Sequence, residues 1–303
     1  MQDLPNSLAV MGSSSIGLEL AQAMARLGVE VSLFDKGDRL GGVRCDKVHA
    51  ALKTVIEDDL RLVLNAELKP SAADAGIRIE WSGYSSGDAT FDYALVATGR
   101  PPNLDSLNLA ATGLALDDNG VPEHDRETMQ CGDSPIFLAG DAGHDLPLLH
   151  EASHEGAIAG RNAVAFPASI KADRFTAFSI TFTSPPVARI GKSEDDGVIT
   201  GTAEFTDQGR ARVDGVNQGV LTLYAAAPDG RLIGADLFAP ASKHLAHIVA
   251  WAVQNGNTAT QLLGMPFYHP TIEEVLKSAL RRICGATTLP LPTDQDRGAP
   301  SGA

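Results

Sequence analysis

The sequence predicts an α/β protein in which a Rossmann-like region with a parallel sheet precedes an α+β domain. Strand-like and helix-like apolar periodicities alternate near the N-terminus, and a glycine turn joins the first strand to the first helix. After Pro167, short alternating segments replace this pattern. The 303 residues exceed one ordinary core, so we expect at least two domains.

The first elements form a βαβ unit. An apolar run at residues 7–11 predicts a strand that ends at Gly12. Residues 16–27 carry apolar side chains at helical spacing, and Gly28 stands where helices often end in glycine. Residues 29–34 predict a second strand, so the unit implies a parallel sheet with helices on its faces.

Later segments of the first half are expected to extend that sheet. The apolar runs at 61–65, 76–81 and 93–97 are its candidate strands, joined by a helix near 48–58. A further buried strand is expected from Pro135 to Ala139.

The remaining elements change in character. We expect a helix that opens at Pro147 and continues to about Ala165. Beyond it we expect antiparallel strands at 177–183, 199–206, 219–226 and 231–238, two or three helices between Lys243 and Arg282, and a disordered tail from Thr287.

The net charge argues against polyanionic partners. The chain has 38 acidic and 24 basic residues, which gives a formal net charge of -14. A field of this sign repels phosphate backbones and anionic membrane surfaces. We therefore expect neither nucleic acid nor a membrane among its partners.

The cysteines and the N-terminus indicate a reducing compartment. Cys45, Cys131 and Cys284 form no CxxC pair, no metal-ligand spacing and no even-numbered disulfide framework. Residues 1–11 lack the features of a signal peptide, and polar residues and prolines interrupt 244–272 too often for it to span a bilayer. These features predict a cytoplasmic protein without a bound metal.

The turn after the first strand has the features of a dinucleotide site. Such a site needs a tight turn, close backbone approach to a pyrophosphate, exposed N–H groups at a helix N-terminus and an acid for the adenosine ribose. Ser14 replaces the middle glycine of the usual GxGxxG pattern, so its Cβ narrows the space for the pyrophosphate. The turn consists of Gly12, Ser13, Ser14, Ser15, Ile16 and Gly17, and the acid is Asp35 at the end of the next strand.

Two alternatives remain open for this turn. A degraded motif also fits an ordinary strand-to-helix turn, but the acid 18 residues beyond Gly17 favours a dinucleotide. The positive charge of Lys36 keeps NADP open as the alternative, since it could meet a 2′-phosphate, although Asp35 would repel that group. We therefore expect NAD rather than NADP.

Four segments, in order, resemble the flavin-dependent pyridine nucleotide-disulfide oxidoreductases, most closely the dihydrolipoamide dehydrogenase-like branch. They are 8–20 (LAVMGSSSIGLEL), 95–103 (LVATGRPPN), 136–156 (IFLAGDAGHDLPLLHEASHEG) and 266–274 (PFYHPTIEE). Their order and spacing match this family over nearly the whole chain. The resemblance implies a flavoprotein oxidoreductase that uses FAD and NAD, and it makes the α+β domain an interface (dimerisation) domain.

On the flavin side, the resemblance implies roles for two neighbouring groups. Gly140 and Asp141 match the dipeptide whose carboxylate holds a flavin ribityl hydroxyl. Leu148, Leu149 and His150 match the helix start that points at the flavin pyrimidine. Taken locally, Asp141 also fits a loop or cap residue and His150 a surface histidine.

On the nicotinamide side, the resemblance implies three further roles. Gly99 closes the strand that returns the chain from the nicotinamide domain to the flavin domain. Glu19 matches the glutamate that approaches the nicotinamide, and Ser15 occupies the position of a lid residue between flavin and nicotinamide.

His269 and Glu274 form the candidate catalytic pair. His269 precedes Pro270, which suits a first helical position, and Glu274 follows five residues after the histidine. A carboxylate that orients one ring nitrogen makes the other nitrogen a proton carrier. For an isolated His-Pro, a histidine at a helix start with a solvated glutamate is the alternative. The resemblance implies that the pair exchanges a thiol proton at the partner subunit's disulfide site, so a homodimer is expected.

The family's usual first segment, with its own GxGxxG turn and a CxxxxC redox disulfide, is not found in this sequence. FAD would therefore find only part of its site, and we expect the chain to depend on a missing flavin-domain segment. The resemblance divides the chain into an NAD(P)-binding Rossmann-like domain at 1–104, a remnant of the FAD-binding domain at 105–167, the dimerisation domain at 168–286 and a disordered tail at 287–303.

Three functional hypotheses follow from these observations. The favoured one is a truncated dihydrolipoamide dehydrogenase-like chain that passes electrons between a lipoamide-like disulfide and NAD through FAD once the missing part is supplied. The second is a non-catalytic NAD-binding and dimerisation module. The third is an NAD-dependent dehydrogenase of another class with His269 or His150 as its base, which no second group of catalytic residues supports.

Overall fold

The computed structural model describes residues 3–193 and 197–287. The chain divides into two compact units: residues up to 99 together with those from 178 onward form the first, and residues 100–177 form the second. The expected domain boundaries stay predictions. The expected tail lies, after Thr287, outside the described residues.

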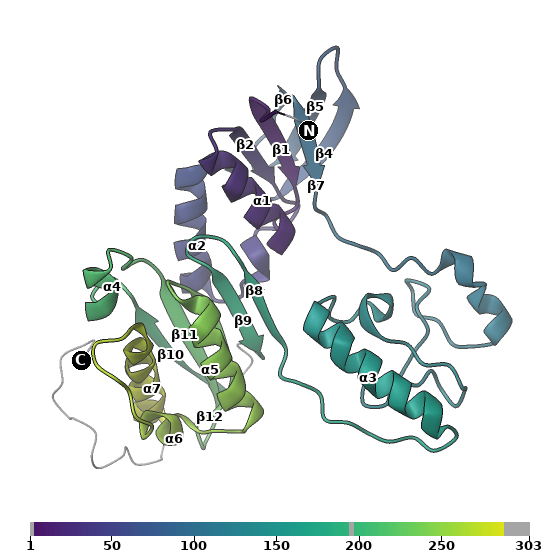
Figure 1. The fold of residues 1–303 in the computed structure, drawn as a ribbon. Helices are drawn as coiled ribbons and strands as arrows, with labels where there is room; N and C mark the ends of the chain where they lie inside the picture. Colours follow the sequence, from purple (N-terminus) through teal and green to yellow (C-terminus); the bar gives the residue numbers. More distant parts are fainter. Residues whose placement is uncertain (1–2, 194–196, 288–303) are drawn as a thin grey trace. The chain divides into compact units, whose positions relative to one another are not determined.

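The first unit begins with the predicted βαβ arrangement (Figure 1). Its sheet has the strand order β3-β2-β1-β7, and every pair is parallel. This confirms the predicted Rossmann-like sheet and its first helices. The elements are β1 (Ser7–Met11), α1 (Ser15–Arg26), β2 (Glu30–Phe34), a short turn η1 (Leu40–Gly42), α2 (Asp46–Asp59), β3 (Arg61–Val63) and β7 (Tyr93–Val96).

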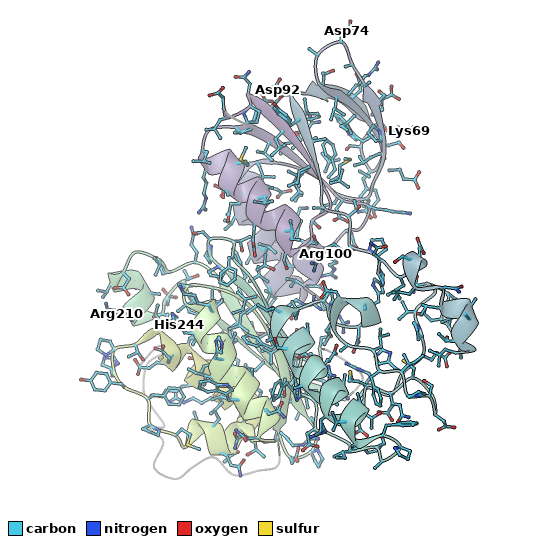
Figure 2. The ribbon with its side chains drawn as sticks, turned by 45° about the vertical axis from the view of Figure 1, so that its right-hand side comes forward. Lys69, Asp74, Asp92, Arg100, Arg210 and His244 are labelled. Atoms are coloured by element: carbon cyan, nitrogen blue, oxygen red, sulfur yellow. The ribbon has the colours of Figure 1, made fainter. Side chains whose placement is uncertain are left out.

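One predicted strand joins a different sheet. The run at 76–81 corresponds to β5 (Ile77–Gly83), which lies in a three-stranded antiparallel sheet between β4 (Ala66–Ala72) and β6 (Gly87–Phe91). The expectation that it extends the parallel sheet is therefore wrong. The connections between these strands are only hairpin turns, whereas a parallel pair needs a long crossover. Figure 2 shows Asp74 at the tip of the β4–β5 hairpin.

The second unit is mostly irregular. It contains the predicted helix as α3 (Leu149–Ala165), preceded by 3-10 turns at Asp105–Leu107, Leu109–Thr112 and Gly140–Gly143. The predicted strand at 135–139 is wrong, because only a single bridge joins Gln130 and Phe137. A strand needs a neighbouring strand to satisfy its backbone groups, and residues 100–177 contain none.

The rest of the first unit is an antiparallel sheet covered by helices, as expected. Its strand order is β10-β11-β12-β9-β8. Four of its strands confirm the predicted segments, and the fifth, β9, was not predicted. The elements are β8 (Phe178–Thr181), β9 (Val187–Gly191), β10 (Val198–Glu204), α4 (Gly209–Val213), β11 (Val220–Ala226), β12 (Arg231–Phe238), α5 (Ser242–Gln254), α6 (Ala259–Leu263), η5 (Ile272–Glu274) and α7 (Val275–Ala286).

A buried carboxylate connects the five-stranded sheet to the start of α2. Asp236 on β12 accepts hydrogen bonds from the backbone N–H groups of Arg44 and Cys45, at 3.2 and 3.0 Å, just before α2. It also accepts one from the hydroxyl of Tyr224 at 3.1 Å. Burial, with the neighbouring Asp236 charge, raises the pKa of Tyr224 far above its usual range, so this phenol remains a donor. The contact fixes α2 against the antiparallel sheet.

Within the described part of the chain, no helix combines the length and apolar character that crossing a membrane requires.

Candidate functional site

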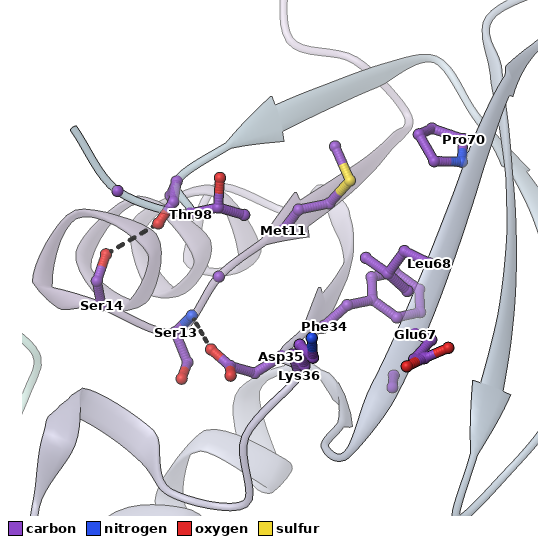
Figure 3. Close-up of a pocket in the computed structure, with 14 residues that line it drawn as sticks. Met11, Ser13, Ser14, Phe34, Asp35, Lys36, Glu67, Leu68, Pro70 and Thr98 are labelled. Atoms are coloured by element: carbon purple, nitrogen blue, oxygen red, sulfur yellow. Dashed lines mark hydrogen bonds between the residues drawn. The ribbon is translucent and has the colours of Figure 1, made fainter. Parts of the chain in front are cut away.

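A pocket of about 650 Å³ lies at the carboxyl ends of β1, β2 and β7 (Figure 3). The carboxyl ends of parallel strands are where open α/β sheets bind their ligands, and the volume suits a nucleotide. The lining residues are Met11, Gly12, Ser13, Ser14, Phe34, Asp35, Lys36, Ala66, Glu67, Leu68, Pro70, Ala97, Thr98 and Gly99.

Two glycines allow the turn at the mouth of this pocket. Gly12 has φ +102°, and a Cβ there would lie 2.4 Å from the carbonyl oxygen of Ala97. A Cβ on Gly17 would lie 1.9 Å from the carbonyl oxygen of Gly12. The first turn of α1 therefore packs directly on the glycine turn, which brings the N-terminus of the helix to the pocket.

Ser14 lies at the position of the missing middle glycine and lines the pocket. Its φ of -64° suits any residue, and its hydroxyl donates a hydrogen bond to the carbonyl oxygen of Ala97 at 3.1 Å (Figure 3). Among the described residues, no side chain caps α1. The helix N-terminus therefore keeps N–H groups suited to an anion.

Replacing Ser14 with glycine is expected to tighten NADH binding several-fold, because removal of Cβ widens the turn that a pyrophosphate approaches. Loss of the hydroxyl contact to Ala97 should lower the free energy of unfolding by about 1 kcal/mol. Calorimetric titration with NADH and urea unfolding measure these effects. Ser14→Ala is the control, since it keeps Cβ; equal tightening in both variants would contradict the role given to Cβ.

Asp35 is held rigidly at the pocket. One carboxylate oxygen accepts a hydrogen bond from the Ser13 backbone N–H at 2.5 Å, and the other accepts one from Gly37 N–H at 2.7 Å. Lys36 and Glu67 line the same pocket, so two acidic residues flank the single lysine. The charges there disfavour a ligand with an added phosphate.

The residues expected near the nicotinamide lie apart from this pocket. Ser15 contacts the hydroxyl of Thr181 at 2.7 Å, and Glu19 accepts a hydrogen bond from the backbone N–H of Phe182 at 2.7 Å. Ile16 is half exposed. The outer face of α1 thus holds the segment that leads out of β8, and Ser15, Ile16, Gly17 and Glu19 are not among the pocket's lining residues.

Sequence reasoning missed one wall of the pocket. Ala66, Glu67, Leu68 and Pro70 come from β4 and face β2 across it (Figure 3). Their strand follows β3 with only two residues between them, so no separate apolar run marks it. The strand pairing with β5 is the signal that could have found them, because the predicted segment at 76–81 needs a neighbour.

The residues expected at a flavin lie together in the second unit. Gly140 opens the 3-10 turn that carries Asp141, and the carboxylate of Asp141 pairs with Arg100, labelled in Figure 2, at 3.3 Å. Leu148 is the N-cap of α3, and Leu149 and His150 form its exposed first turn. Among the described residues no side chain caps this helix either, so its N-terminus favours negative charge.

His269 and Glu274 come together as the sequence predicts. His269 Nδ1 lies 3.0 Å from Glu274 Oε2, and the glutamate side chain is only 3% exposed while the imidazole is 65% exposed. The helix does not begin at Pro270: Thr271 is the N-cap, and its N–H donates to the same Glu274 oxygen at 3.2 Å. A buried glutamate replaces the solvated one of the alternative hypothesis.

All three cysteines of the chain are buried and unpaired with one another. Cys45 donates a hydrogen bond to Thr222, and burial raises the pKa of the Cys131 thiol above its usual value. Neither property suits a thiol that exchanges with a disulfide substrate.

The fold and the pocket define a class of protein: one with a pocket at the carboxyl edge of a parallel sheet and an antiparallel sheet followed by an exposed histidine on a buried glutamate. The chain belongs to the pyridine nucleotide-disulphide oxidoreductase family, because residues 1–156 match that family and residues 177–280 match its dimerisation domain. This confirms the resemblance found in the sequence.

Known relatives agree with this assignment. The dihydrolipoyl dehydrogenases of Halobacterium salinarum and Bacillus subtilis are each 29% identical over 94% of this chain, which spans 62% and 63% of their length. LpdA from Mycobacterium tuberculosis has a TM-score of 0.82 at 24% identity, covering 93% of this chain and 62% of its own. The flavoprotein disulfide reductase RclA from Escherichia coli has a TM-score of 0.80 at 22% identity, and the match covers 93% of this chain and 66% of the RclA chain. The LpdA and RclA structures therefore support the fold.

Proposed function

We propose that this chain supplies the dinucleotide-binding and dimerisation parts of a dihydrolipoyl dehydrogenase-like enzyme that passes electrons between a lipoamide-like disulfide and NAD through FAD. The observation that carries the proposal is the buried Glu274 held against the exposed imidazole of His269. Burying a carboxylate is costly unless it is paired, and an exposed imidazole held by a buried partner stays accessible to a reacting group.

The proposed proton path runs through the histidine. Glu274 accepts a hydrogen bond from the Nδ1–H group of His269. This contact orients the ring and leaves Nε2 to accept or return a thiol proton. Lys277 lies 3.9 Å from the other oxygen of Glu274 and helps to hold the carboxylate in place. Such a pair at the surface serves a thiol from another subunit, so a homodimer is part of the proposal.

The pocket is the proposed NAD site. The glycine turn and the uncapped start of α1 suit the pyrophosphate, and Asp35 suits the adenosine ribose hydroxyls. NAD is preferred over NADP because Asp35 and Glu67 flank Lys36 and would repel a 2′-phosphate. Glu19 and Ser15 are proposed to lie nearer the nicotinamide end.

The second unit is proposed to hold the ribityl and pyrimidine end of FAD. Its donor set fits: Asp141 offers a half-exposed carboxylate to a hydroxyl, and α3 presents an uncapped N-terminus. When bound, FAD would supply the electron transfer between the disulfide couple and NAD. The glycine turn at Gly12 is assigned to NAD, so the ADP part of FAD is proposed to bind a flavin-binding segment supplied separately.

Replacing His269 with glutamine is expected to lower lipoamide-dependent turnover about 10²- to 10⁴-fold, the usual loss when a positioned acid–base group is removed. The assay mixes the chain with FAD, NAD, dihydrolipoamide and the flavin-binding segment of a dihydrolipoyl dehydrogenase. NADH affinity should not change, since the pocket lies on other elements. Tyr268→Phe, at the exposed neighbouring residue, is the control; equal turnover in His269→Gln and the parent chain would refute the assignment.

The buried cysteines favour a second candidate, a non-catalytic NAD-binding and dimerisation module. This alternative predicts NADH binding and dimers from the chain, with no flavin absorbance and no turnover after a flavin-binding segment is supplied. An absorbance spectrum of the mixture separates the two.

A further inference from the structure

A buried ionic cluster in the second unit lies directly beneath the loop of Asp141. Arg174 Nη2 lies 2.8 Å from Glu151 Oε2 and 2.5 Å from Glu155 Oε1. The side chains of Glu151 and Glu155 are 1% and 5% exposed, and they lie four residues apart on one face of α3. A single guanidinium therefore faces two buried carboxylates.

Glu155 also reaches the backbone of the loop. Its second oxygen accepts a hydrogen bond from the N–H of Gly140 at 2.7 Å. Gly140 has φ +70°, and a Cβ there would lie 3.1 Å from the Cβ of Ala152 on the same helix. The glycine thus sits against α3, and its N–H is fixed by a charged acceptor.

The two contacts of this loop differ in strength. Asp141 pairs with Arg100, but both side chains are more than half exposed, so water screens that contact. The contact of Glu155 with Gly140 is part-buried and charge-assisted, because the Glu155 side chain is only 5% exposed. The position of the Asp141 carboxylate is therefore set mainly by the hydrogen bond to the backbone N–H of Gly140, and less by the ion pair with Arg100.

Stability alone is a weak reason for this cluster. Burying charges costs desolvation that their mutual attraction roughly repays, and apolar residues of similar size often serve as well. A carboxylate that holds one loop amide in a fixed position is better explained by a functional requirement for that position of the loop.

We propose that Glu155, oriented by Arg174, is a positioning residue for flavin: it fixes the Gly140 N–H and thereby the carboxylate of Asp141 that receives the ribityl chain. The inference rests on the proposed function. Glu151 also forms an ion pair with Arg174 but makes no hydrogen bond to Gly140, so its role is limited to the ionic cluster.

The experiment compares Glu155→Gln with Glu151→Gln, which also removes one charge beside Arg174 but keeps the contact to Gly140. Two quantities are measured on the full chain: hydrogen exchange of the Gly140 amide, by NMR of protein labelled with [¹⁵N]glycine, and affinity for FAD, by quenching of flavin fluorescence with the flavin-binding segment of a relative present. Glu155→Gln is expected to speed exchange and to weaken FAD binding, each about tenfold, the size of one hydrogen bond to a charged group. Glu151→Gln should change each by less than about threefold.

Glu155→Asp is a second variant in case the amide substitution prevents folding, because it keeps the charge near Arg174 but shortens the reach to Gly140. Unchanged FAD affinity in a folded Glu155 variant, with the parent chain binding FAD, would overturn the positioning role. Equal losses in the Glu151 and Glu155 variants would overturn it too, since they would show a merely structural cluster. Failure of the parent chain to bind FAD would instead refute the flavin part of the proposed function.

Discussion

Replacing Gly17 with alanine is expected to abolish measurable NADH binding and to destabilise the first unit. The added Cβ would lie 1.9 Å from the carbonyl oxygen of Gly12, so α1 must move away from the glycine turn. Gly12 resists movement, because its N–H donates a hydrogen bond to the carbonyl oxygen of Phe34 at 2.8 Å. The helix N-terminus would then leave the place where a pyrophosphate approaches.

The expected loss of unfolding free energy is about 1–3 kcal/mol, the usual cost of overpacking a close contact. Urea unfolding measures it, and calorimetric titration with NADH measures binding. Gly285→Ala is the matched control: it also adds a methyl group to a helix of this unit, and within the described residues nothing lies within 4 Å of the new Cβ. Unaltered NADH affinity in Gly17→Ala would show that the turn does not hold the dinucleotide.

Replacing Asp236 with alanine is expected to lower the free energy of unfolding strongly, although Asp236 is not among the residues that line the pocket. Three donors would lose their acceptor: the part-buried backbone N–H of Arg44 and the buried N–H of Cys45 and hydroxyl of Tyr224. Since an unsatisfied buried donor costs about 1–3 kcal/mol and the three contacts are coupled, the expected total is about 3–5 kcal/mol. Burial lowers the pKa of Arg189 and the Asp236 charge opposes that shift, so the variant would also remove this opposite charge.

Tyr224→Phe is the control for this prediction. It removes one donor and leaves the two backbone contacts of Asp236 intact, so the expected loss is about 1 kcal/mol. Unfolding followed by the fluorescence of Trp81 in a Trp251→Phe chain and of Trp251 in a Trp81→Phe chain would show whether the small sheet that holds Trp81 still unfolds together with α5 in Asp236→Ala. A loss no larger than that of Tyr224→Phe would mean that the carboxylate does not fix α2 against the five-stranded sheet.

Much of the fold was predictable because it depends on local periodicity. The βαβ unit at 7–34, the helix α3 and four strands of the second sheet each carry their pattern within one short segment. The errors concern pairing. The run at 76–81 has the pattern of a strand, and periodicity does not say which strand lies beside it.

The candidate site likewise has one part that the sequence predicted and one part that it did not. The glycine turn and Asp35 were found because the chemistry of a pyrophosphate and a ribose requires those residue types at that spacing. The wall from β4 was missed, because Glu67, Leu68 and Pro70 acquire their place only when the small antiparallel sheet folds against β2.

The sequence by itself determined the family, the first βαβ unit and the pairing of His269 with Glu274, since each rests on residue type and on short spacing along the chain. Only the tertiary structure decided that Glu274 is buried, that Asp236 holds the start of α2 against the five-stranded sheet and that Glu155 reaches Gly140. Those contacts join residues whose separation along the chain leaves no local pattern, and their energies depend on the removal of water, which happens only when the elements pack together.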